Sequence, residues 1–136
     1  MSDDIPEGYQ PAWNEGFNAY VGPFYGAARE DGTVHFLMDP REQHMNGGGA
    51  LHGGLLMAFA DATLGTAVNL AIDGAPSATV TLNTDFIAAG KLDVRLEAEA
   101  EVTRRTRSVV FVSGRVYQGD KTLLTASGIW KILGAA

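Results

Sequence analysis

The sequence contains no cysteine among its 136 residues. This absence excludes disulfides, thiolate metal sites and a cysteine nucleophile. The three histidines, His35, His44 and His52, lack the spacing of a zinc site, and no acidic cluster suggests a calcium loop. The G-x-S-x-G, Walker A and Rossmann motifs are also missing. We therefore expect no metal and no bound cofactor, and any catalytic nucleophile must be a residue other than cysteine.

Basic residues are scarce: 10 lysines and arginines stand against 16 aspartates and glutamates, a formal net charge of −6. This balance argues against general nucleic-acid binding and against an electrostatic membrane anchor. The start, MSDDIPEGYQP, is acidic and lacks the basic region and apolar run of a signal peptide. Together with the missing cysteines, these features lead us to expect a cytoplasmic protein with neither a nucleic-acid nor a membrane partner.

One apolar run, residues 51–72, has nearly the length of a membrane span. It is interrupted by Asp61, Asn69, two threonines and several glycines, and no basic residue lies close to either end. A carboxylate inside a bilayer is costly. We therefore expect a buried helix rather than a transmembrane one.

The apolar pattern predicts one domain over residues 1–136, in which residues 1–12, with Pro6 and Pro11, form a loose N-terminal arm. Expected helices span residues 13–20 and 53–70. Expected strands span residues 22–28, 33–38, 78–88, 94–103, 108–117 and 123–133. Strand 94–103 alternates small or apolar residues with charged ones, which is typical of a strand with one buried and one wet face.

The helix over residues 53–70 is apolar on nearly every side, so the strands and the helix must cover one another. The economical arrangement is an α+β fold in which a curved antiparallel sheet wraps around one long central helix. The wet strand face and the size of the domain suit a sheet that is extended or stacked through dimerisation.

Asp61 is the one carboxylate in this helix, and no lysine or arginine stands three or four residues away to pair with it. On a helical wheel it shares a stripe with Gly54, Met57, Leu64, Gly65 and Val68. A buried, unpaired carboxylate is costly or has a raised pKa. Two interpretations stay open: a structural residue at an oligomer seam or on a backbone amide, or a general base or nucleophile beside a cleft.

The segment before this helix is rich in glycine, with Gly47, Gly48, Gly49, Gly53 and Gly54. A helix that begins at Gly53 presents free amide groups and a partial positive charge, which suit an anion or a developing oxyanion. Asp61 lies about 12 Å further along the helix axis at 1.5 Å per residue. A site at a two-fold interface, with the loop of one chain and Asp61 of the other, would bring the two together.

These residues carry a resemblance. Asn46, the sequence His52-Gly53-Gly54, Asp61 and the following Thr79 resemble the hotdog-fold acyl-CoA thioesterases of the PaaI-like (4-hydroxybenzoyl-CoA thioesterase) superfamily. The likeness extends from about residue 21 to the C-terminus. It implies a hotdog fold, an acyl-CoA substrate and a homodimer as the minimal unit, often assembled into a tetramer.

The resemblance also implies roles. Asp61 would attack the thioester or activate water, and the Gly53 N–H would polarise the thioester carbonyl. Asn46, in the loop of the partner subunit, would hold the water or the substrate. Thr79 would orient the nucleophile. His52 would either shape the loop or transfer a proton.

Substrate contacts are expected in two places. Arg104, Arg105 and Arg107, with Ser108, form the densest basic cluster, which is either a solvated turn or a site for the phosphates of coenzyme A. Lys91 is a weaker candidate for these phosphates. The acyl pocket is expected to involve Gly54, Met57, Leu64, Val68, Phe86 and residues 13–20.

The expected function is hydrolysis of a medium-chain or aryl acyl-CoA to the free acid and CoA, with CoA only as part of the substrate. One alternative is a hotdog hydratase or dehydratase, although no histidine has the spacing from Asp61 that those families use. Another is a non-catalytic acyl-CoA-binding or regulatory module, which has no need of a buried acid.

Overall fold

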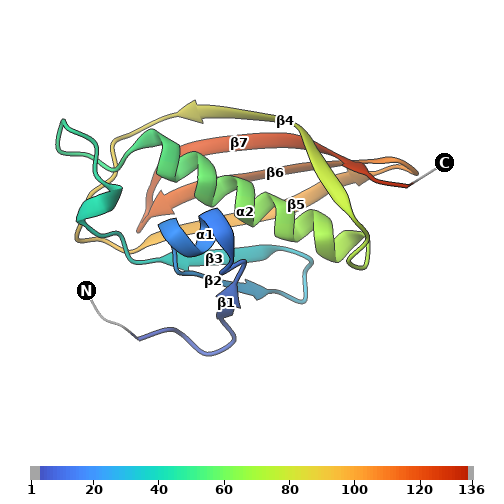
Figure 1. Ribbon diagram of the computed structural model, residues 1–136, viewed down its shortest axis with the longest axis horizontal. Coiled ribbons are helices and arrows are strands. Elements are labelled where there is room, and N and C mark those ends of the chain that lie inside the picture. Colours follow the sequence, from blue (N-terminus) through green and yellow to red (C-terminus); the bar gives the residue numbers. More distant parts are fainter. Residues whose placement is uncertain (1–3, 135–136) are drawn as a thin grey trace.

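The computed structural model describes residues 4–134, in which a seven-stranded antiparallel sheet curves around one long helix (Figure 1). This confirms the expected α+β fold. The chain runs through β1 (Gln10–Ala12), α1 (Gly16–Val21), β2 (Phe24–Ala28), β3 (Val34–Met38), the 3-10 helix η1 (Glu42–His44), α2 (Gly53–Ala71), β4 (Ser77–Phe86), β5 (Leu96–Arg105), β6 (Val109–Gln118) and β7 (Lys121–Ile132). The order across the sheet is β1-β2-β3-β5-β6-β7-β4.

The expectation of a loose arm over residues 1–12 is wrong at its C-terminal end. Residues Gln10–Ala12 form β1, which pairs with β2 at the edge of the sheet, where a proline is tolerated. Residues 1–3 of that arm lie outside the described part of the chain. Helix α1 begins at Gly16, later than expected, because Trp13 has a positive φ angle of 55°, which α-helical backbone does not allow.

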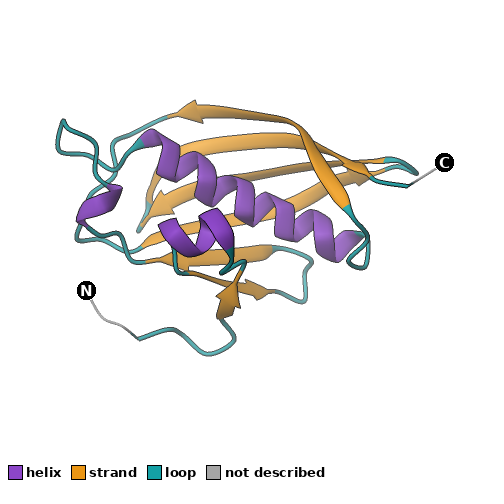
Figure 2. Ribbon diagram, in the orientation of Figure 1, coloured by secondary structure: helices purple, strands orange, loops and turns teal. Residues whose placement is uncertain are grey.

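The core lies between α2 and the concave face of the sheet. Phe59 on α2 is fully buried, and its ring meets those of Phe24 and Phe36 edge-on at centroid distances of 5.3 Å and 6.2 Å. Helix α2 is long and apolar enough to cross a membrane, but half of its most apolar 18 residues are buried within this fold. Helices α1 and α2 lie on the same face of the sheet (Figure 2).

Strand β5 shows the predicted alternation. Leu96, Ala98 and Ala100 are buried against the core, while Glu99 points to the outer face. There Glu99 accepts a hydrogen bond from Arg115 of the neighbouring β6 at 2.6 Å. The outer face of the sheet is therefore polar and carries cross-strand ion pairs, as expected for a wet face.

Gly114 on β6 is predicted to be essential for the packing of α2 against the sheet. A Cβ at this position would lie 2.3 Å from the carbonyl oxygen of Glu99 and 2.9 Å from Leu64 Cδ1. Because that carbonyl belongs to the β5–β6 ladder, it cannot move freely. We expect Gly114→Ala to lower the free energy of unfolding by about 1–3 kcal/mol, measured by denaturant titration.

The matched control is Gly65→Ala on α2, where a Cβ would meet Trp130 only at 3.8 Å, an ordinary contact. This variant should be as stable as the wild type, or more stable, because alanine favours helix. Equal midpoints for Gly114→Ala and the wild type would contradict the close packing at Gly114.

Candidate active site

Asp61 lies on the outer side of α2, facing β4 rather than the core. Its carboxylate Oδ1 accepts a hydrogen bond of 3.4 Å from the Thr79 hydroxyl, so the structure places these two predicted site residues side by side. In the single chain Asp61 is exposed on one side, which differs from the expected burial. Protein atoms still surround the rest of the carboxylate, and this partial burial raises the pKa of Asp61, while the Thr79 hydrogen bond lowers it by less.

The predicted stripe around Asp61 is only partly right. Leu64 and Val68, expected in the acyl pocket, are 1% and 0% exposed and pack in the core instead. Val68 lies about 10 Å further along the helix axis at 1.5 Å per residue, where the surrounding chain covers the same helix face. Gly65, one turn after Asp61, is the member of the stripe that faces the pocket described next.

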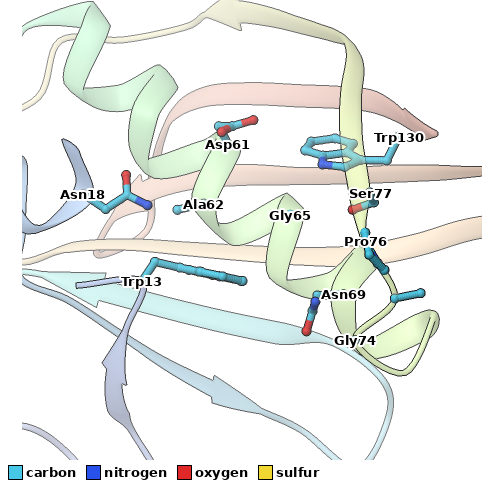
Figure 3. A pocket seen from close by; sticks show the side chains of 11 residues that line it. Trp13, Asn18, Asp61, Ala62, Gly65, Asn69, Gly74, Pro76, Ser77 and Trp130 are labelled. Atoms are coloured by element: carbon cyan, nitrogen blue, oxygen red, sulfur yellow. The ribbon is translucent and has the colours of Figure 1, made fainter. Parts of the chain in front are cut away.

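A pocket of about 370 Å³ opens beside Asp61 (Figure 3). Helix α2 forms its floor, the N-terminal segment one wall, and the start of β4 with the end of β7 the other wall. Its main side chains are Trp13, Asn18, Asp61, Asn69, Ser77 and Trp130. The pocket therefore combines one carboxylate with amide, hydroxyl and indole groups.

Sequence reasoning missed most of this lining. It named Asp61 and the segment 13–20, but not Asn69, Ser77 or Trp130. One signal was present: Ala62 and Gly65 are small residues on the pocket side of α2, which lets other groups approach the helix. The indole of Trp130 approaches this side, within 3.9 Å of where a Cβ of Gly65 would lie.

The start of α2 forms a second group of predicted residues. His52 is the N-cap, and its Nδ1 accepts a hydrogen bond from the Gly54 amide at 2.8 Å. This contact supports the loop-shaping interpretation of His52. The amides of Leu55 and Leu56 donate to the His52 carbonyl, whereas the Gly53 amide has no acceptor within residues 4–134.

Asn46 organises the loop before this helix. Its side-chain oxygen accepts hydrogen bonds from the amides of Gly48 at 2.8 Å and Ala50 at 3.1 Å. This is a turn-forming role within the chain. The amide nitrogen of the Asn46 side chain stays available for a ligand, since these contacts use only the oxygen.

Phe86 packs over the same helix end. A Cβ on Gly53 would lie 3.0 Å from the Phe86 ring, and a Cβ on Gly54 would lie 2.9 Å from His52 Nδ1. The two glycines thus allow both side chains to approach the free amide. The Phe86 ring is nevertheless 56% exposed, because β4 is the edge strand of the sheet.

The basic cluster lies at the other end of the molecule. Arg104 and Arg105 are exposed at the end of β5, and Arg107 is exposed in the turn to β6; this arginine turn lies close to the C-terminal end of β7. The Ile132 amide donates to the Ser108 carbonyl at 2.8 Å, and the Leu133 amide donates to Pro76 at 2.9 Å. The arginine turn is therefore connected to the Pro76–Ser77 end of the Asp61 pocket, and the glycine loop lies at the opposite end of α2 (Figure 1).

The single chain thus keeps two parts of the predicted site separate. Asp61, Thr79 and the pocket lie at the middle of α2, whereas the free Gly53 amide is about 12 Å away along the helix. One thioester carbonyl cannot reach both within one chain. Among the residues that the structure describes, no group of three histidines and carboxylates gathers to hold a metal.

Comparisons with known proteins place this geometry in a family. A sequence profile of the thioesterase superfamily matches residues 48–125. PA0474 of Pseudomonas aeruginosa, whose name assigns it provisionally to the esterases, is 32% identical over 133 residues, or 95% of this chain and 98% of its own. Acyl-coenzyme A thioesterase 13 of Homo sapiens is 28% identical over 97 residues, which cover 71% of this chain and 69% of that protein.

A solved structure shows the same fold. The PaaI protein from the phenylacetic acid degradation operon of E. coli is 21% identical to this chain and superposes with a TM-score of 0.80. The match covers 90% of this chain and 88% of the PaaI chain. The chain belongs to the thioesterase superfamily and has its hotdog fold.

Proposed function

We propose that this protein hydrolyses a medium-chain or aryl acyl-CoA to the free acid and CoA. The observation that carries the proposal is the Asp61 carboxylate, which lies at a pocket, has a raised pKa and accepts a hydrogen bond from Thr79. A perturbed carboxylate at a cleft is typical of a catalytic acid or base. Membership in the thioesterase superfamily and the similarity to acyl-coenzyme A thioesterase 13 support the choice of a thioester.

The chemistry follows from these groups. Asp61 removes a proton from water as the water oxygen attacks the thioester carbonyl carbon, and the Gly53 amide stabilises the oxyanion that forms. The C–S bond then breaks, and the CoA sulfur takes the proton from Asp61. In the alternative route Asp61 itself attacks, which releases the thiolate and forms an anhydride that water hydrolyses. Single-turnover hydrolysis in labelled water separates the two routes, because only the anhydride route leaves label in the Asp61 carboxylate.

The complete site requires two chains in this proposal. Strand β4 lies at the edge of the sheet, and its neighbourhood exposes Val80, Phe86 and Ile87 at 59%, 56% and 59%. A long exposed edge strand with apolar side chains on it is a ready partner for the same strand of a second copy. Pairing about a two-fold axis would bring the glycine loop of each chain toward Asp61 of the other.

The proposal is tested by thiol release from a panel of acyl-CoA thioesters, with the molar mass in solution determined by light scattering. We expect hydrolysis of at least one thioester by a dimer or a tetramer. Binding of CoA without release of any thiol would favour a binding module. A monomer with full activity would contradict a site formed by two chains.

The arginine turn is predicted to bind the nucleotide part of the substrate. We expect the combined change of Arg104, Arg105 and Arg107 to glutamine to raise KM for acyl-CoA about tenfold, because guanidinium groups bind phosphates through charge-assisted hydrogen bonds. The kcat value should change little. The same reaction with an acyl-pantetheine, which has no nucleotide, should show no difference between variant and wild type.

The matched control for this prediction is Arg29→Gln, which removes an exposed arginine that contacts Tyr9 at the end of β2. This control should keep the wild-type KM for both substrates. A triple variant with unchanged KM for acyl-CoA would show that the turn is only solvated.

A further inference from the structure

Trp13 attaches the N-terminal segment to the helix that carries Asp61. Its indole Nε1–H donates a hydrogen bond to the Thr66 hydroxyl on α2. The Thr66 hydroxyl in turn donates to the Ala62 carbonyl at 2.8 Å. The ring is therefore fixed beside the pocket, where Figure 3 shows it nearly edge-on beneath Ala62.

The backbone and exposure of Trp13 are unusual for a structural tryptophan. Its φ angle of 55° lies in the left-handed region, which is unfavourable for a bulky residue. Its side chain is still 48% exposed, so full burial in the core does not compensate for this conformation. Such a combination beside a pocket points to a role in ligand binding.

The orientation of the substrate in the pocket determines which part of it lies against Trp13. This step rests on the proposed function, in which the phosphates of CoA bind at the arginine turn. That turn adjoins the Pro76–Ser77 end of the pocket, on the same side as Trp130. Trp13 and Asn18 lie on the opposite side of α2 (Figure 3), so an acyl group that passes Asp61 extends toward them.

The wall formed by Trp13 lies outside the part of the chain that matches the family profile, residues 48–125. The profile therefore says nothing about the shape of this wall. Asp61 lies within the matched part, and Thr79 does as well. The proposed catalytic groups at Gly53 and Asp61 thus come from a different segment of the chain than the wall formed by Trp13.

We propose that Trp13 is a specificity-determining residue whose indole limits the length of the acyl group that the pocket accepts. An indole held against the helix by a hydrogen bond presents a large, rigid surface. Chains that end before the ring fit the pocket, and longer chains collide with it.

The test measures kcat/KM for a series of saturated acyl-CoA thioesters of increasing chain length in four proteins. These are the wild type, Trp13→Ala, Trp13→Phe and the control Tyr9→Ala. Tyr9 is an aromatic residue of the same N-terminal segment that contacts Arg29 and does not line the pocket, so its removal should leave the profile unchanged. We expect Trp13→Ala to raise the ratio of kcat/KM for long over short chains at least about tenfold, the lower end of the effect of one methylene group in an apolar pocket. Trp13→Phe should give an intermediate ratio.

Failure of this inference differs from failure of the proposed function. An unchanged chain-length profile in an active Trp13→Ala enzyme overturns the role of Trp13 and leaves the thioesterase proposal standing. If the wild type hydrolyses none of the thioesters, calorimetric binding of thioether analogues of the same acyl-CoA series takes the place of kcat/KM. If Trp13→Ala then binds longer acyl chains relatively better than the wild type does, the result supports Trp13 as the residue that limits acyl length. Equal chain-length preferences in the two proteins overturn it.

Discussion

Replacing Asp61 with asparagine is expected to lower kcat for acyl-CoA hydrolysis by about 10²–10⁴-fold, the usual contribution of a general acid–base residue. Asparagine keeps the size of the side chain and can still accept the Thr79 hydrogen bond, but it can neither take a proton from water nor attack the thioester. Thiol release measures the effect. The control is Asp120→Asn, an exposed carboxylate in the β6–β7 turn, which should retain wild-type activity.

The same variant should be more stable than the wild type at neutral pH. Burial raises the pKa of Asp61 above 3.8, so the ionised carboxylate is less favourable in the folded protein than in the unfolded chain. This penalty is fully present above the folded-state pKa, and it disappears as the pH falls through that value toward 3.8. We therefore expect Asp61→Asn to raise Tm at pH 7 and to lose this advantage in acid.

The pH dependence of the reaction follows from the same shift. The wild-type kcat/KM should fall on the acid side with a midpoint above 3.8, because protonated Asp61 cannot act as a base. A variant that keeps the wild-type kcat would remove Asp61 from the mechanism. An Asp61→Asn variant that has lost catalysis but has a lower Tm than the wild type at pH 7 would contradict the destabilising effect of the buried Asp61 charge, and would leave the catalytic role of Asp61 standing.

Much of the fold was predictable because local patterns directly reflect burial. Alternation in β5 marked the two faces of the sheet, and the apolar run of α2 required a cover on several sides. The strand at Gln10–Ala12 was missed because three residues with a proline carry no periodic signal. A helical wheel also could not show which face of α2 the sheet covers, so it grouped the core residue Val68 with Asp61.

The candidate site was predictable only where it forms one motif. The residues from Asn46 to Asp61 are neighbours in sequence, and their loop and helix follow from glycine and capping chemistry. The pocket walls are different, since Trp13 and Trp130 come from opposite ends of the chain and line one pocket only after the sheet has formed. No local spacing relates two such residues, and only the fold brings them to Asp61.

Removing the amide hydrogen of Gly53 is expected to cost nearly as much activity as removing the Asp61 carboxylate. Proline is tolerated at the first position of a helix, and the preceding His52 has φ −64° and ψ 133°, the extended geometry that proline favours. Gly53→Pro therefore deletes the N–H with little change in backbone, and kcat should fall about 10²–10³-fold, as for the loss of an oxyanion donor. Gly53→Ala is the matched control, because its Cβ meets Phe86 in the same way but its amide remains. Similar losses in both variants would assign the effect to crowding by Phe86.

The two inactive variants together determine whether each site uses one chain or two. If the Gly53 loop of one chain serves Asp61 of the other, a mixed dimer of Asp61→Asn and Gly53→Pro holds one site with both defects and one site that is intact. Random exchange of chains should then restore roughly one quarter of wild-type activity, since half of the dimers are mixed and half of their sites are complete. Mixing cannot restore activity if both groups act within one chain. The 12 Å between them along α2, at about 1.5 Å per residue, makes recovery the expected result.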